Sequence, residues 1–326
     1  MPPTPDFAET FPYSLRKLNL YSLSRLERIL GLDRGYIRAL AAVAGRYYSP
    51  FTKPNKSRPF ERIAKPRKLR VIDNPSEELK AVQSLITERL LKQVELPEHV
   101  CGGVKGKSVL DNVALHSGAR VLIKIDIARF FPSITNVHVY RVWAGLLGCS
   151  PEISGLLTQL TTFERHLPQG APSSTLLANL VLYSADGPIR GECERVGIRY
   201  SSWIDDLAFS SDDPRPIVPL VVATLRKSGF RISRKKLEII GPRERKILNG
   251  VVLGRRVSVP SERLARVRSG IHKLQEGKVP AAEVDRYVEG LRGGVAQIST
   301  IDRAKARRLR EDLEFARKHC CATVQK

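Results

Sequence analysis

The spacing of apolar residues divides the chain into helical and strand-like segments. Helical spacing recurs before residue 230 in the segments 18–44, 76–94, 111–117, 137–162, 174–193 and 217–228. Strand-like runs cover 70–72, 120–127 and 198–211, and the last of these contains a tight turn at Asp205-Asp206. A hairpin near Gly254 is expected over 246–259, and three helices are expected over 261–318. Together these segments predict an α+β protein.

Composition limits the class of protein further. The hydrophobic fraction of the 326 residues, 42%, is enough for a substantial core. No run of about 18 apolar residues is present, so no membrane-spanning helix is expected. Residues 1–15 lack the basic and apolar regions of a secretory signal. The five cysteines have no zinc-ligand spacing and indicate free thiols in the cytoplasm.

The net charge of the chain is +22, and its pI is about 10.1. Such a charge attracts polyanions, most commonly nucleic acid, although a ribosome-associated or merely soluble basic protein would also fit. Basic residues concentrate in 53–70, with eight Lys/Arg and one Glu, and in 226–273, with fifteen Lys/Arg and three Glu. A solvated basic surface is the alternative. However, a density this high repels itself without a polyanion, which favours contact with phosphates.

Two apolar strands end in carboxylates, in the segments Ile123–Ile127 and Trp203–Leu207. An unpaired charge at a buried strand end is unfavourable, and adjacent aspartates repel one another. A divalent cation removes both problems, and three carboxylates can hold two Mg²⁺ ions about 3.5–4 Å apart. An Asp-Asp pair alone would also suit an ordinary hairpin turn, so the flanking sequence has to decide.

Four ordered segments resemble the palm motifs of reverse transcriptases, which are RNA-templated DNA polymerases. They are Lys124–Ile134, Leu167–Ser174 followed by Leu177–Leu180, Trp203–Ser210, and Gly229–Lys236. Their order and spacing agree with the family over roughly residues 60–300. Trp203 stands where the family usually has Tyr or Phe, so an aromatic ring remains to pack under the primer end.

The resemblance implies the right-hand polymerase fold, with fingers, a palm of antiparallel sheet plus helices, and a helical thumb. On this basis 1–46 is expected to be an N-terminal helical extension. Residues 47–260 would form the fingers and palm, and 261–326 would form the helical thumb.

The resemblance also implies roles for residues around the carboxylates. The metal ligands would be Asp126, Asp205, Asp206 and the backbone carbonyl of Ile127. They would hold two Mg²⁺ ions, for which Mn²⁺ could substitute. Lys236 would donate a proton to the leaving pyrophosphate, with Lys235 as a competitor for that role.

Other positions would contact the incoming deoxynucleotide. Phe131, five residues after Asp126, matches the steric gate that excludes a ribose 2′-hydroxyl. Gln169 and Gly170 would pack against the sugar and base, and Lys68 and Arg70 would bind the triphosphate. The alternative is an ordinary core position for Phe131, a plain turn for Gln169 and Gly170, and a solvated surface for Lys68 and Arg70.

Smaller signatures resemble the retron enzymes among bacterial reverse transcriptases. The segment Asn112–His116 is similar to a retron Asn-Ala-x-x-His element, and Leu248–Gly250 lies where retrons usually have Val-Thr-Gly. The chain also stops too soon for a maturation region or an RNase H domain. The residues expected to bind RNA are Asn112, His116, Asn249, Gly250, Arg255, Arg256, Arg263, Arg266, Arg268 and Lys273.

A retron enzyme implies particular partners. It would use dNTPs to copy a structured non-coding RNA encoded beside it, primed from a 2′-hydroxyl of that RNA. The DNA copy would remain in a branched RNA–DNA hybrid, called msDNA. The implied role is defence against phage together with an effector protein, with no membrane involved.

Two other hypotheses stay open at this point. The first is another defence-associated, group-II-like or diversity-generating reverse transcriptase, although Gln169 argues against the diversity-generating type. The second is an RNA-binding scaffold that no longer polymerises, although all three aspartates are retained. An inverted-repeat RNA encoded just upstream would favour the retron.

Overall fold

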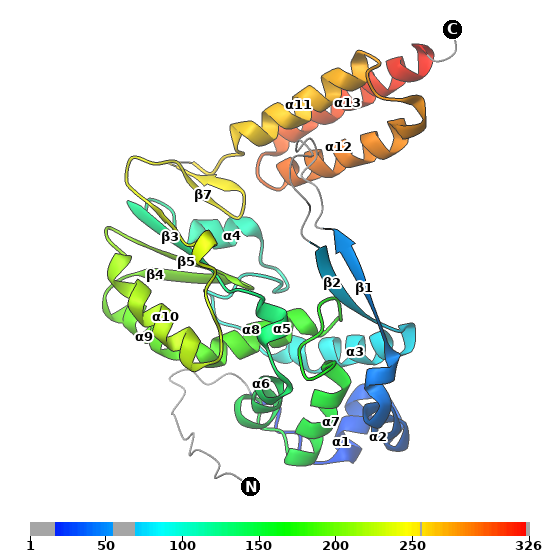
Figure 1. Cartoon of the computed structure of the whole chain (residues 1–326), viewed down its shortest axis with the longest axis vertical. Helices are drawn as coiled ribbons and strands as arrows, with labels where there is room; N and C mark the ends of the chain where they lie inside the picture. Colours follow the sequence, from blue (N-terminus) through cyan, green and yellow to red (C-terminus); the bar gives the residue numbers. More distant parts are fainter. Residues whose placement is uncertain (1–16, 55–68, 255, 324–326) are drawn as a thin grey trace. The chain divides into compact units, whose positions relative to one another are not determined.

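The computed structural model describes residues 17–54, 69–254 and 256–323, with side chains to residue 319 (Figure 1). The chain divides into two compact units. Of the described residues, the first unit contains 17–52, 71–108 and 120–239, and the second unit contains the rest.

A four-stranded sheet organises the first unit. Its strand order is β4 (Arg199–Trp203), β5 (Asp206–Ser211), β3 (Val121–Asp126) and β6 (Glu238–Ile240). β5 runs antiparallel to both β3 and β4. The expected pair of strands over 198–211 is confirmed, but the turn lies at Ile204-Asp205 and Asp206 already begins β5. This fold is therefore a mixture of helices and antiparallel sheet, as expected.

Two segments expected to be single helices are each divided in two. The segment 18–44 forms α1 (Leu23–Leu30) and α2 (Arg34–Val43) because Gly31 takes the left-handed conformation at φ 63° and ends α1. The segment 174–193 forms α8 (Ser174–Ala185) and α9 (Gly187–Arg195). Pro188 has no N–H to continue a helix and lies in the first turn of α9.

Other elements lie wholly or mostly in the first unit. They are β1 (Tyr48–Pro54), β2 (Leu69–Pro75), α3 (Glu77–Arg89), α5 (Phe130–Ser133), α6 (Asn136–Arg141), α7 (Pro151–Thr161) and α10 (Val218–Lys227). A π-helical turn, Val142–Leu146, follows α6. β1 and β2 form a separate two-stranded sheet.

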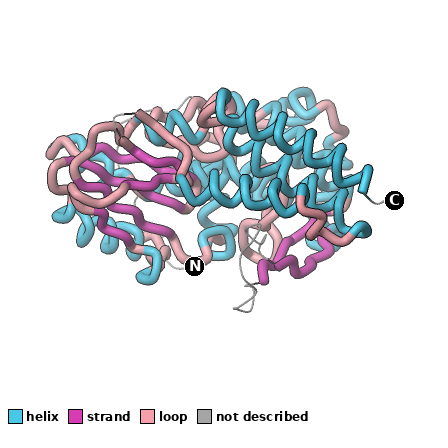
Figure 2. The backbone as a smooth tube through the Cα atoms, turned by 90° about the horizontal axis from the view of Figure 1, so that it is seen from above, coloured by secondary structure: helices cyan, strands magenta, loops and turns pink. Residues whose placement is uncertain are grey.

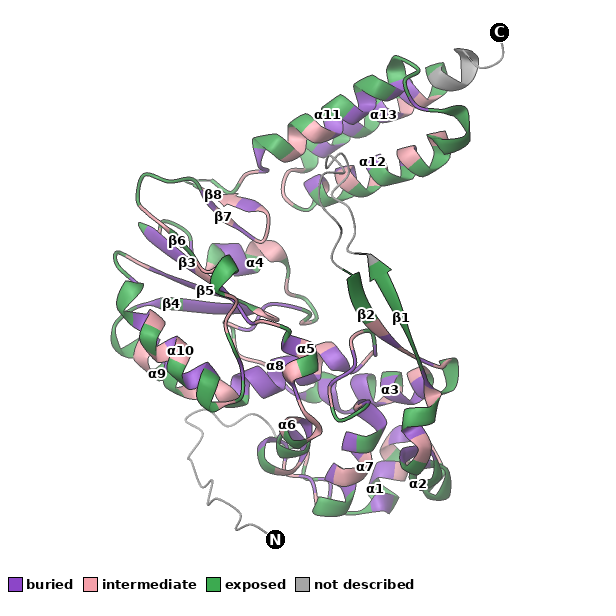
Figure 3. Cartoon of the chain, in the orientation of Figure 1, coloured by how far each residue is buried: buried purple, intermediate pink, exposed green. Residues whose placement is uncertain are grey.

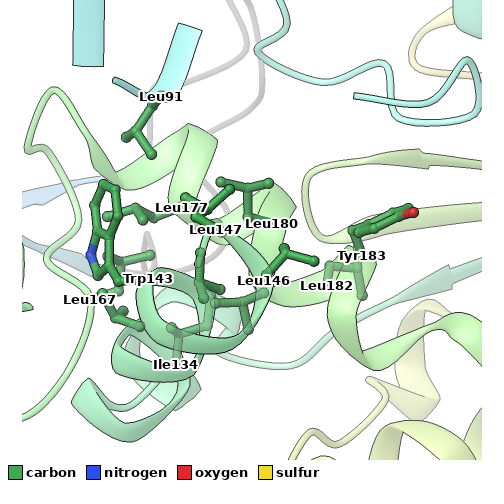
Figure 4. Packing of buried hydrophobic residues seen from close by; sticks show 14 of the residues in the cluster. Leu91, Ile134, Trp143, Leu146, Leu147, Leu167, Leu177, Leu180, Leu182 and Tyr183 are labelled. Atoms are coloured by element: carbon green, nitrogen blue, oxygen red, sulfur yellow. The ribbon is translucent and has the colours of Figure 1, made fainter. Parts of the chain in front are cut away.

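The core of the first unit is built around α8, which is buried along most of its length (Figure 3). Leu177 and Leu180 of α8 pack with Trp143 and Leu147, and all four are at most 1% exposed (Figure 4). This apolar layer positions α8 within the same core as the strands that carry the candidate site.

The three helices expected over 261–318 lie in the second unit (Figures 1 and 2). α11 (Ser261–Gln275), α12 (Val284–Ser299) and α13 (Arg303–Thr323) share an apolar core that includes Leu274 and Leu291. α11 ends at Gln275 and α12 ends at Ser299, because the apolar periodicity is interrupted after each of them.

A short helix and a hairpin complete the second unit. α4 (Val109–Ala114) contacts β8 (Val251–Leu253), which pairs with β7 (Lys246–Leu248). The expected hairpin is confirmed, because Val252 and Ser258 form an antiparallel bridge on either side of Gly254. An additional turn joins β7 to β8 at Asn249 and Gly250, whose φ angles of 48° and 75° are both positive. An Asn-Gly pair is well suited to such a two-residue turn.

No helix among the described residues combines the length and apolar character that crossing a membrane requires. Cys101, Cys149 and Cys193 are buried.

Candidate active site

The three aspartates converge at one end of the sheet. Asp126, the last residue of β3, is the direct partner of Asp206, the first residue of β5. Directly opposed side chains in an antiparallel pair lie on the same face, with Cβ atoms about 4.5–5.5 Å apart. The N–H of Ile127 donates to the Asp205 carbonyl over 2.9 Å and ties the end of β3 to the turn. The residues expected to act together therefore do lie together.

The turn that presents Asp205 has a strained backbone. Trp203 and Asp206 pair across β4 and β5, so Ile204 and Asp205 form a two-residue connection. Ile204 has φ 60°, a conformation that β-branched residues avoid. Such a residue costs about 1–3 kcal/mol and persists only where its surroundings hold it in place. Trp203, as the partner of Asp206, keeps an aromatic side chain beside that aspartate.

The carboxylates carry more negative charge than their surroundings neutralise. Asp206 remains accessible to solvent, yet desolvation by the surrounding protein raises the pKa of its carboxyl to about 6. The charges of Asp205 and Asp126 act in the same direction, while Lys236 and Lys124 oppose them only in part. Asp126 is only 6% exposed, and its carboxylate forms an ion pair with the Lys236 ammonium.

The residues present fit a divalent cation. Clustered carboxylate oxygens are ligands that Mg²⁺ prefers, and a cation would relieve the repulsion that raises the Asp206 pKa. No three His, Cys, Asp or Glu side chains among the described residues are already gathered as a metal site. In this structure the Asp126 carboxylate pairs instead with Lys236.

The fourth motif segment holds Lys236 in that position. The N–H of Ser233 donates to the Asp126 carbonyl over 2.7 Å, and the N–H of Ala128 donates to the Arg231 carbonyl over 2.8 Å. Burial acts to lower the pKa of Lys236, but the hydrogen bond and the charge of Asp126 outweigh it and raise the pKa. Of the two candidate lysines, Lys236 is therefore the one held beside the carboxylates as a cation.

Phe131 lies on α5, five residues after Asp126 in the sequence. Its ring is half-buried and makes an edge contact with Phe130, with ring centroids 6.1 Å apart. Phe130 is buried in the core, and Phe131 packs against the same core while part of its side chain stays accessible.

A buried carboxylate that the sequence analysis missed holds the Gln169 loop. Asp73 of β2 is 5% exposed, and its Oδ2 accepts the N–H of Gln169 over 3.0 Å and lies 3.1 Å from Nε2 of His166. The N–H of Asp73 donates back to the Gln169 carbonyl over 3.0 Å. Gly170 has φ 126°, and a Cβ there would lie 2.9 Å from Cγ2 of Ile72. No local signal marks this carboxylate, because Arg70 interrupts the apolar run before it.

Replacing Asp73 with Ala is expected to raise the KM for dNTP about tenfold or more, because hydrogen bonds to a charged group contribute roughly 1.5–3 kcal/mol. RNA binding should not change. Steady-state kinetics of Asp73→Ala would measure the KM. Glu77→Ala, measured in the same way, is the control because the Glu77 side chain is 90% exposed. An unchanged KM would show that Asp73 does not position the loop.

The structure describes only one of the two basic residues that are expected to bind the triphosphate. Arg70 lies exposed on β2, and Lys68 lies outside the described residues.

The retron-like signatures meet in the second unit. Nδ2 of Asn112 donates to Oδ1 of Asn249 over 3.3 Å, so α4 contacts the turn of the hairpin. Asn112 and His116 are both buried, at 1% and 0% exposure. Gly250 lies directly against the Arg263 guanidinium. These residues therefore form one small assembly, although they are far apart in the sequence.

The basic residues of this unit differ in exposure. Arg256, Arg268 and Lys273 are exposed, and Arg263 and Arg266 are half-buried. Burial, together with the charge of Arg266, lowers the pKa of Arg263. Arg255 lies outside the described residues.

Known proteins match this chain over most of its length. The family model described as reverse transcriptase (RNA-dependent DNA polymerase) matches residues 53–252. The retron Ec86 reverse transcriptase of Escherichia coli is 31% identical over 295 residues, which cover 89% of this chain and 87% of that protein. The retron Ec83 enzyme of E. coli is 29% identical over 242 residues, covering 69% of this chain and 77% of that protein. The retron Mx65 enzyme of Myxococcus xanthus is 28% identical over 288 residues, covering 81% and 66%.

The chain therefore belongs to the reverse transcriptase family, the RNA-directed DNA polymerases. Within that family it groups with the retron reverse transcriptases, as the smaller signatures predicted. Enzymes of the reverse transcriptase family use divalent metal ions, which agrees with the carboxylates at the end of the sheet.

Proposed function

We propose that this enzyme copies a structured non-coding RNA into DNA by two-metal nucleotidyl transfer and leaves the product as a branched RNA–DNA hybrid. The observation that carries the proposal is the direct pairing of Asp126 with Asp206 beside the Asp205 turn. The retron relatives support the choice of an RNA template and a branched product.

In the proposed mechanism Asp126, Asp205, Asp206 and the Ile127 carbonyl hold two Mg²⁺ ions. When bound, these ions lower the pKa of the primer hydroxyl and neutralise the triphosphate. The hydroxyl loses its proton to solvent, its oxygen attacks the α-phosphorus of the dNTP, and the bond from that phosphorus to the bridging oxygen breaks. Lys236, kept protonated by its carboxylate neighbours, donates its proton to the leaving pyrophosphate.

The nucleotide would be selected and oriented by residues around the carboxylates. The accessible face of Phe131 meets the sugar and excludes a 2′-hydroxyl. Gln169 and Gly170, held by Asp73, pack against the sugar and base. Arg70, with Lys68 beside it in the sequence, binds the triphosphate through charge-assisted hydrogen bonds.

The proposed architecture is the right-hand arrangement of polymerases. Residues 1–46 form an N-terminal helical extension, 47–260 form the fingers and palm, and 261–326 form the thumb. The antiparallel sheet and the three C-terminal helices support this division.

The proposed partners are an RNA, its DNA copy and an effector protein in defence against phage. The exposed Arg256, Arg268 and Lys273 support contact with RNA phosphates. Asn112, His116, Asn249 and Gly250 would contribute by holding α4 against the hairpin that carries neighbouring basic residues. Arg255, Arg263 and Arg266 complete the proposed RNA-binding set.

The nucleic acid that copurifies with the enzyme tests this proposal. We expect RNA and DNA that migrate as one species under denaturing conditions and separate after a debranching enzyme cleaves the 2′,5′ linkage. Sequencing should identify the RNA as encoded next to the enzyme. Copurification of unlinked or random nucleic acid would reject the retron reaction.

A further inference from the structure

A second segment of backbone lies alongside the strand that leads into the aspartate turn. The N–H of Ser202, on β4, donates to the His99 carbonyl over 2.8 Å, and the N–H of Cys101 donates to the Ser202 carbonyl over 2.9 Å. Val100 and Ser202 form a parallel bridge. We call His99–Gly103 the bracing loop.

The bracing loop reaches the strained turn at Gly102. A Cβ on Gly102 would lie 2.6 Å from the Ile204 nitrogen and 2.8 Å from the Trp203 carbonyl carbon. Real Cβ atoms essentially never approach backbone this closely. Gly102 does not have a positive φ. Its lack of a side chain therefore serves this close approach and not an unusual backbone conformation.

Two side chains from other elements fix the bracing loop in place. Asn179 of α8 is 1% exposed, and its Nδ2 donates to the Gly102 carbonyl over 2.7 Å. The Lys107 ammonium donates to the carbonyls of Pro97, Glu98 and Val100 over 3.0, 2.8 and 2.9 Å. The loop is therefore held at both ends against a buried helix and its own following segment.

A buried network beneath β4 holds the start of the bracing loop. The His99 ring stacks on Tyr200 of β4, with ring centroids 5.2 Å apart. The Tyr200 hydroxyl donates to Asp186 over 2.7 Å, and Asp186 is paired with Arg190. Burial first, then the charges of Arg190 and Lys107, lower the pKa of His99 to about 3. A neutral ring therefore packs at this end of the loop.

We infer that Gly102 is a positioning residue for polymerisation and that the bracing loop, held by Asn179 and Lys107, keeps the Ile204-Asp205 turn in its strained conformation. A positive φ at Ile204 persists only where surrounding structure imposes it. Gly102 supplies the backbone that leaves the turn no room to relax. The inference rests on the proposed metal-binding role of the three aspartates.

Gly102→Ala in the full-length enzyme tests this inference, with poly(rA)·oligo(dT) and dTTP as substrates. We expect kcat to fall about 10²-fold, because small displacements of reacting groups have effects of that order. The KM for dTTP should be unchanged. Mn²⁺ binding, measured by electron paramagnetic resonance without nucleotide, should weaken about tenfold. Hydrogen exchange of the metal-free protein should accelerate in the peptide covering 200–210.

Gly191→Ala is the matched control, because a Cβ at Gly191 on α9 meets nothing within 4 Å. It should leave all four measurements unchanged. If Gly102→Ala does not fold, the same four measurements on Asn179→Ala test the inference. Normal Mn²⁺ binding and normal exchange over 200–210 in a folded variant would overturn the inference. A wild-type enzyme without metal-dependent DNA synthesis would instead overturn the proposed function.

Discussion

Replacing both Asp205 and Asp206 with Asn is expected to lower Mg²⁺-dependent DNA synthesis by at least about 10⁴-fold, since metal stabilisation is worth several kcal/mol and each 1.36 kcal/mol is tenfold in rate. The amides keep the size of the side chains but remove the two charges that would attract the cations. RNA binding should remain near the wild-type level, because the basic residues are unchanged. Primer extension and a filter-binding assay would measure the two effects separately.

The chain offers a matched control for this double variant. Asp212 and Asp213 form a second adjacent pair just beyond the other end of β5, and both are exposed. Asp212→Asn with Asp213→Asn should keep full activity. If the variant with Asp205→Asn and Asp206→Asn still polymerises, the assignment of these residues as metal ligands is refuted.

The same double variant should be at least as stable as the wild type in the absence of metal. The pKa of Asp206 is raised in the folded state, to about 6 from 3.8, mainly by desolvation. An acid with a raised folded pKa destabilises the fold as pH rises from about 4 through 6. Removal of that ionisation should therefore remove this loss of stability. A large drop in Tm at pH 7 would show that lost activity reflects misfolding.

Phe131→Ala is expected to raise ribonucleotide incorporation relative to deoxynucleotide incorporation on the order of 10²-fold, the range in which shape alone discriminates between substrates. The half-buried ring packs against the core, in which Phe130 is fully buried, and keeps an accessible surface. Its removal should therefore open space for a 2′-hydroxyl without emptying the core. The ratio of kcat/KM values for rUTP and dTTP on poly(rA)·oligo(dT) gives the measurement.

Phe131→Tyr serves as the control because it keeps the bulk of the ring and should retain discrimination. Equal ratios in the wild type and Phe131→Ala would reject the gate and return Phe131 to an ordinary packing role.

Much of the fold could be predicted because the relevant signals are local. β3, the β4–β5 pair and the three C-terminal helices follow from apolar periodicity in short windows. The two divided helices were missed because one glycine, Gly31, and one proline, Pro188, outweigh an otherwise continuous apolar pattern. The reversal near Gly254 was predicted, but the tighter turn at Asn249-Gly250 was not, although such a pair is typical of hairpin turns.

The residues of the candidate site could be predicted only where they lie in continuous sequence motifs. The aspartates were found because each ends an apolar strand. Asp73 and Gly102 were missed because their partners, Gln169 and Ile204, lie about a hundred residues away in sequence. Contacts between residues so far apart in sequence depend on the tertiary fold, and the residues next to Asp73 and Gly102 do not indicate them.

Anomalous diffraction from crystals of the enzyme grown with Mn²⁺ and a non-hydrolysable dNTP tests the central claim most directly. We expect manganese density between the carboxylates of Asp126, Asp205 and Asp206, with Lys236 displaced from Asp126. Manganese bound only elsewhere, with the Asp126–Lys236 pair intact beside a bound nucleotide, would contradict it.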